Sequence, residues 1–89
     1  MFPILCEATL SSGGAEVDLV LEYPSNEIIA IEMKRSLTPS ITKSLHEGIT
    51  ALKPKQTYIV YPGQASYNLS NNVQVMPLYA MLEKLSQGI

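Results

Sequence analysis

The sequence predicts an α/β fold in which helices flank a four-stranded mixed sheet. Three observations predict this class: strict apolar–polar alternation over residues 15–23, an apolar run over 27–34, and a stripe at helical spacing between residues 41 and 52. The predicted order is strand, strand, helix, strand, strand, helix. A chain of 89 residues is long enough for one domain, so we expect a single unit over residues 1–89.

The first two strands are predicted to form a hairpin. AEVDLVLEY, residues 15–23, alternates apolar and polar side chains, so one of its faces is apolar. Tyr-Pro-Ser-Asn at residues 23–26 has the chemistry of a turn. EIIAIEMK, residues 27–34, is the second strand, and the short turn makes the pair antiparallel.

A helix is predicted next, with Thr38 as its N-cap and Pro39 as its first residue. It should end before Pro54, since proline cannot continue a helix. Its apolar stripe is Ile41, Leu45, Ile49 and Leu52. The strand–helix–strand unit over residues 28–61 should therefore form a right-handed parallel crossover.

The C-terminal third is predicted to hold two strands and a helix. QTYIVYP, residues 56–62, is a third strand; residues 63–72 form a polar loop; NVQVMP, residues 72–77, is a fourth strand at the sheet edge. Pro77 opens the last helix, whose apolar face is Leu78, Met81, Leu82 and Leu85. Before the first strand, FPILCEATL gives at most a hint of a further helix.

Composition excludes several classes of protein. With 46% hydrophobic and 16% charged residues, the chain is typical of soluble globular domains, and its net charge of −2 argues against a generally basic nucleic-acid binder. No apolar run approaches the ~20 residues that cross a membrane. The stretch MFPILCEATLSSGGAE has no basic residues and too short an apolar segment for a secretory signal, so we do not expect it to act as one. Cys6 is the only cysteine and His46 the only histidine, so an intrachain disulfide and a zinc cluster are excluded. A reducing, cytoplasmic setting fits best.

The charges are distributed unevenly. Residues 1–32 contain six acids and no lysine or arginine, whereas residues 33–64 contain five bases and one acid. This asymmetry suggests a cation site beside an anion-binding surface, and the alternative is accidental surface scatter.

Glu32 and Lys34 are the candidate catalytic residues. Two positions apart on a strand, they share one face, with Cα atoms about 6.5–7 Å apart. Asp18 is expected on the neighbouring strand of the hairpin, and two carboxylates with the Met33 carbonyl would offer Mg²⁺ or Mn²⁺ the oxygen ligands it needs. Lys34 would act as the catalytic base, orient a water molecule or stabilise charge on a phosphate. The alternative is an ion pair on a solvated strand end, which stabilises by only ~0–1 kcal/mol.

Four bases follow the candidate site, and lysine and arginine contacts with phosphates dominate affinity for nucleic acids. We predict phosphate contacts from these residues; the alternative is an ordinary solvated surface. The four are Arg35, Lys43, Lys53 and Lys55.

Asp18 and the tripeptide Glu32-Met33-Lys34, set on a hairpin that is followed by a helix and a strand, resemble the PD-(D/E)xK nuclease core of the restriction-endonuclease-like fold. The stretches GGAEVDLVLE, IIAIEMKRS, LKPKQTYIVYP and NVQVMPLYAML resemble, more closely, the C-terminal domain of prokaryotic AAA-type ATPases, a domain of unknown function. The likeness covers residues 12–85.

The resemblance implies a restriction-endonuclease-like core and a Mg²⁺-dependent phosphodiesterase acting on DNA. Asp18, Glu32 and Lys34 would be the metal and catalytic positions, with Glu16 in support. Two departures stand out: Val17 replaces the proline of the name-giving motif, and the upstream acid is absent or reduced to Glu7.

No Walker A loop occurs in these residues, so the resemblance implies the C-terminal fragment of a larger ATPase. A second function therefore stays open beside the nuclease. In it, the domain is a non-catalytic module that forms a homodimer or docks to DNA, to a partner or to an ATPase module.

Overall fold

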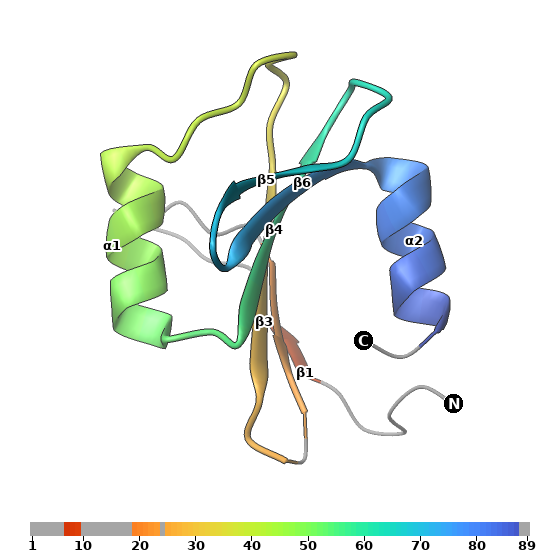
Figure 1. Cartoon of the computed structure of the whole chain (residues 1–89). Helices are drawn as coiled ribbons and strands as arrows, with labels where there is room; N and C mark the ends of the chain where they lie inside the picture. Colours follow the sequence, from red (N-terminus) through yellow and green to blue (C-terminus); the bar gives the residue numbers. More distant parts are fainter. Residues whose placement is uncertain (1–6, 10–18, 24, 88–89) are drawn as a thin grey trace.

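The computed structural model describes residues 7–9, 19–23 and 25–87. Within these residues, six strands form one mixed sheet in the order β1-β2-β3-β4-β6-β5, and two helices cover it (Figure 1). The α/β class and the mixed sheet are thus confirmed. The elements are β1 Glu7–Thr9, β2 Leu19–Glu22, β3 Ile28–Met33, α1 Lys43–Leu52, β4 Gln56–Tyr61, β5 Tyr67–Ser70, β6 Val73–Pro77 and α2 Leu78–Ser86.

The predicted hairpin and crossover are both present. Strands β2 and β3 pair antiparallel, and their turn closes through hydrogen bonds from Tyr23 N to Glu27 O and from Asn26 N to Tyr23 O. Asn26 has a φ of 68°, a left-handed conformation that asparagine tolerates better than most residues. Strands β3 and β4 pair in parallel across α1, and β4 pairs in parallel with β6.

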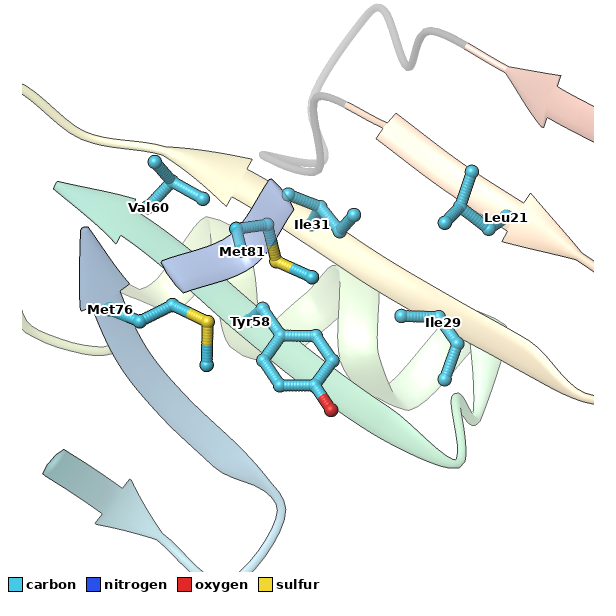
Figure 2. Packing of buried hydrophobic residues seen from close by; sticks show 7 residues of the cluster. All are labelled: Leu21, Ile29, Ile31, Tyr58, Val60, Met76 and Met81. Carbon is cyan, nitrogen blue, oxygen red and sulfur yellow. The ribbon is translucent and has the colours of Figure 1, made fainter. Parts of the chain in front are cut away.

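Helices α1 and α2 lie on opposite faces of the sheet (Figure 1), so the central strands are buried on both sides. This explains why β3 and β4 are almost continuously apolar instead of alternating. The core on the α1 side consists of Ala30, Leu45, Ile59, Tyr61, Val73 and Val75. The core on the α2 side, shown in Figure 2, consists of Leu21, Ile29, Ile31, Tyr58, Val60, Met76 and Met81.

Helix α1 begins four residues later than predicted. Its N-cap is Thr42, whose Oγ1 accepts a hydrogen bond from Leu45 N at 3.1 Å. Thr38 instead takes part in a local turn, in which its backbone N donates to Ser36 Oγ at 3.0 Å. Both threonines have cap chemistry, and the sequence cannot tell which one the chain uses. The C-terminal end of α1 agrees with the prediction that the helix stops before Pro54, because Lys53 caps the helix in a left-handed conformation.

The sheet has more strands than the predicted four. The polar loop expected over residues 63–72 contains β5, which pairs antiparallel with β6, so β6 is interior and β5 is the edge. Glu7–Thr9, in the segment that hinted at a helix, is the strand β1, which pairs with β2. Edge strands bury little, so a segment such as Tyr-Asn-Leu-Ser can pair without an apolar pattern.

Helix α2 begins after Pro77, as predicted, but it is rotated relative to the expected face. Met81 is 2% exposed, whereas Leu78 and Leu82 are 54% and 56% exposed. Ala80 packs against the core on the α2 side instead. The predicted apolar face is therefore right for Met81 and Leu85 and wrong for Leu78 and Leu82.

Candidate functional site

Glu32 and Lys34 lie together at the C-terminal end of β3. Glu32 Oε2 is 3.6 Å from Lys34 Nζ. Lys34 follows the last residue of β3, yet its backbone N still donates to Val60 O at 2.8 Å, so it continues the parallel pairing with β4. The structure thus places both side chains on one face, as their spacing predicts.

Glu32 is buried, with 2% of its surface exposed. It alternates with Ile31 and shares a face with Ala30, and its register partner is Ile59, so it stands on the α1 side of the sheet among apolar residues. Burial of a charged group is costly unless it is paired, hydrogen-bonded or bound to a metal. The alternative of an ion pair on a solvated strand end is therefore right about the ion pair and wrong about the exposure of Glu32.

The other residues predicted at the metal site are Asp18, Met33 and the supporting Glu16. Asp18 and Glu16 lie outside the described residues. Leu19, the first residue of β2, pairs with Ile31, the residue before Glu32. Met33 is the last residue of β3 and adjoins Glu32. Among the described residues, no three His, Cys, Asp or Glu side chains come together as a metal site.

The four predicted phosphate-binding residues divide between the two ends of the parallel strands. Arg35 follows β3 and Lys43 begins α1, which puts both near the end that carries Glu32. Helix α1 runs back across the sheet (Figure 1), so Lys53 at its C-cap lies toward the opposite end. Lys55 N donates to Ile28 O at the start of β3. The four do not form one surface.

Lys55 forms an ion pair of its own. Its Nζ is 2.7 Å from Glu27 Oε2, and Ser25 Oγ donates to Glu27 Oε1 at 3.0 Å. The hydrogen bond with Lys55, joined by that from Ser25, lowers the pKa of Glu27, and the same contact raises the pKa of Lys55. Lys55 is thereby compensated by a carboxylate, which weakens its case as a phosphate contact.

Tyr61 lies next to Lys34 on the adjacent strand, and its hydroxyl has a role that no sequence pattern indicates. Tyr61 Oη donates to Ala65 O at 2.6 Å and accepts from Ala65 N at 3.1 Å. The dipeptide Pro62-Gly63 indicates a turn after β4. No local pattern predicts that the hydroxyl of Tyr61, the last residue of β4, forms hydrogen bonds with the backbone of Ala65.

Two pockets among the described residues lie away from Glu32. One, of about 210 Å³, is lined by Tyr23, Glu27, Ile29, Lys55, Gln56 and Tyr58. The other, of about 410 Å³, is lined by Ile41, His46, Ile49, Ser70, Asn71, Asn72 and Val73.

In the part of the chain that is described, neither helix has the length and apolar character needed to span a membrane.

Comparisons with known proteins identify the family. Residues 10–81 match the Domain of unknown function (DUF4143). Uncharacterized proteins of Mycobacterium bovis (Mb2031c) and Mycobacterium tuberculosis (Rv2008c) are each 38% identical over 63 residues, which is 71% of this chain. The matched part is 14% of either relative's length. No solved structure matches the chain. The chain belongs to the family Domain of unknown function (DUF4143).

Proposed function

We propose that this domain is the core of a metal-dependent phosphodiesterase acting on DNA, built on a restriction-endonuclease-like fold. The observation that carries the proposal is the buried Glu32 with Lys34 two residues on, at the C-terminal end of a strand that pairs in parallel with β4. In open sheets with parallel strands, ligands bind at the carboxyl ends of those strands.

The proposal assigns the second carboxylate to Asp18. The hairpin register pairs Leu19 with Ile31. In the sequence, Asp18 precedes Leu19 and Glu32 follows Ile31. Continuation of that register by one residue would set the two carboxylates across from each other. Together with water molecules and the Met33 carbonyl, they match the hard oxygen ligands that Mg²⁺ or Mn²⁺ takes, and Glu16 would support them.

When bound there, the ion would supply Lewis acidity toward a phosphate oxygen and lower the pKa of a water ligand. Lys34 is held by the Glu32 carboxylate at 3.6 Å and stays partly exposed, so its ammonium can donate to that water or to a phosphate oxygen. Water oxygen attacks phosphorus as the bond from phosphorus to the leaving oxygen breaks; the attacking water loses one proton to solvent, and the leaving oxygen takes up one proton from solvent. Arg35 and Lys43 would contact neighbouring phosphates from the same end of the sheet.

Metal binding and DNA cleavage test the proposal. Wild type is expected to bind Mn²⁺ and nick plasmid DNA, whereas Glu32→Gln and Asp18→Asn should weaken Mn²⁺ binding about 10- to 100-fold. Lys34→Ala should keep the metal and lower cleavage about 10²- to 10³-fold.

The pair Glu27 and Lys55 offers a matched control, since it is also a glutamate–lysine ion pair of this sheet. Glu27→Gln and Lys55→Ala should leave both metal binding and cleavage unchanged. A wild-type protein that neither binds Mn²⁺ nor cuts DNA would sink the proposal, and full activity in Lys34→Ala would remove the role given to that residue.

Phosphate contacts are tested separately by salt dependence. Arg35→Ala and Lys43→Ala should each weaken DNA binding and lower the slope of log K against log salt by about 1. Lys53→Ala, at the far end of α1, is the control and should leave the slope as it is. Equal effects from all three would mean that these bases act only through net charge.

A second candidate function is a non-catalytic module that forms a homodimer or docks to DNA or an ATPase. The observation that favours it is a set of exposed apolar side chains on α2, namely Leu78, Tyr79 and Leu82 at 54–64% exposure. Here, sedimentation should show a dimer for wild type and a monomer for the double variant Leu78→Ser with Leu82→Ser. A monomeric wild type at high concentration would count against self-association.

A further inference from the structure

The connection after β4, residues 62–66, leaves from the same end of the parallel strands as the connection after β3 (Figure 1). Met33 pairs with Val60, and Lys34 N donates to Val60 O, so Lys34 and Tyr61 occupy neighbouring positions on adjacent strands. Tyr61 belongs to the core on the α1 side, the same side as Glu32. We call residues 62–66 the β4 loop.

Two tyrosine hydroxyls hold the backbone of the β4 loop. Tyr61, which is 7% exposed, donates to Ala65 O at 2.6 Å and accepts from Ala65 N at 3.1 Å. Tyr79 Oη, from α2, donates to Gln64 O at 3.3 Å. A surface loop normally turns such backbone groups to water. Here three hydrogen bonds between tyrosine hydroxyls and the backbone fix two consecutive residues, Gln64 and Ala65.

The ring of Tyr61 is itself held in place. A Cβ at residue 63 would overlap the Tyr61 atoms Cε2, Cζ and Oη, so only glycine lets the chain pass so close to the ring. On β5, the Tyr67 ring meets the Tyr61 ring edge-on, with centroids 6.0 Å apart. The hydroxyl that holds Ala65 therefore comes from a ring with little freedom.

We propose that the β4 loop is a preorganised wall of the Glu32–Lys34 site that holds the DNA backbone, and that Tyr61 is the residue that positions it. This inference rests on the proposed function. Its exposed polar side chains, Gln64 and Ser66, are uncharged and suit hydrogen bonds to phosphate and sugar oxygens, which fix the register of a protein on DNA. A loop that is ordered in advance loses less entropy when substrate binds.

Tyr61→Phe is the decisive variant, because it keeps the ring and removes both hydrogen bonds to Ala65. Amide exchange over residues 64–66 should rise about tenfold, as expected for the loss of about one net hydrogen bond. The DNA dissociation constant, or KM where turnover is measured, should rise by a similar factor, while kcat and Mn²⁺ affinity stay within about twofold. Gly63→Ala, which displaces the ring, should have the same pattern. Tyr67→Phe keeps its ring contact and is the matched control.

The outcomes separate the inference from the proposed function. If Tyr61→Phe raises amide exchange but leaves DNA affinity and KM unchanged, the loop is only structural and the inference fails while the proposed function stands. If the variant weakens Mn²⁺ binding as much as DNA binding, Tyr61 supports the whole site and does not position substrate. A wild type that binds neither Mn²⁺ nor DNA overturns both.

Discussion

Glu32 is a carboxylate that the sheet places among apolar side chains on the α1 side, 3.6 Å from the ammonium of Lys34. At the scale of one residue, this placement opposes stability, because removal of a charge from water costs several kcal/mol before its partner compensates. Such a residue is typical of a site kept for its chemistry.

We therefore expect Glu32→Met to leave the free energy of unfolding unchanged or to raise it by about 1–4 kcal/mol, as when a whole buried ion pair is replaced by apolar residues, because the remaining charge of Lys34 is not left buried. Lys34 is 20% exposed and can turn its ammonium to water once the carboxylate is gone. Urea unfolding followed by circular dichroism measures the change. Leu45→Ala, a fully buried apolar site, should instead cost about 2–5 kcal/mol. A comparable loss in Glu32→Met would show that Glu32 is structural.

The buried hydroxyl of Tyr58 predicts that the free energy of unfolding falls at alkaline pH. Burial raises the pKa of its hydroxyl above the ordinary value of 10.0, and nearby Lys55 offsets this only in part. Because the folded pKa is the higher one, the contribution to stability is complete below the unfolded pKa and is lost as pH rises through the folded pKa. Between about pH 9 and about pH 11, wild type should lose more unfolding free energy than Tyr58→Phe. Equal declines in the two proteins would contradict the assignment.

At the scale of elements, caps and packing decide what periodicity leaves open. Thr38 and Thr42 both precede helical sequence, and α1 uses Thr42 because its Oγ1 reaches Leu45 N. In α2, the stripe of leucines and methionine spans a wide arc, and only contact with the sheet chooses which part of it is buried.

Helix capping gives a matched pair of variants. Thr42→Ala should lower the free energy of unfolding by about 0.5–2 kcal/mol, the usual cost of a lost N-cap. Thr38→Ala, in the preceding turn, should change it by less than about 0.5 kcal/mol. Thermal or urea unfolding distinguishes the two, and a larger effect at Thr38 would place the helix start at Pro39, as the Thr38-Pro39 pair predicts.

The rotation of α2 relative to its predicted face gives a second matched pair of variants. Met81→Ala should cost about 2–5 kcal/mol, because the side chain is 2% exposed and fills the core on the α2 side. Leu82→Ala, one residue on and 56% exposed, should cost less than about 1 kcal/mol. Similar losses at both positions would mean that Leu82 is covered in solution, for instance by a second copy.

At the scale of the whole molecule, β3 and β4 are the centre of the sheet, with helices on both faces and neighbours on both edges. Strands β1 and β5 each have one neighbour within the described residues. The candidate site thus stands at the end of the most enclosed strands, and the β4 loop extends from the same strands.

Hydrogen exchange should follow this arrangement. Amides of β3 and β4 should exchange through global unfolding, while those of β5 should exchange through local opening with a smaller free energy. Native-state exchange over a range of denaturant measures both. Protection in β5 equal to that in β4 would show that the outer edge of β5 is covered.

The sequence alone predicts the β2–β3 hairpin, the parallel crossover through α1, and the shared face of Glu32 and Lys34. Each depends on residues close together in the chain: alternation, the turn at residues 23–26, and spacing by two along a strand. The packing of distant segments, in contrast, buries Glu32, separates Lys53 and Lys55 from Arg35, and adds β5 to the sheet. These features depend on which segments meet, because burial and pairing with distant strands leave no local pattern in residues such as Tyr-Asn-Leu-Ser.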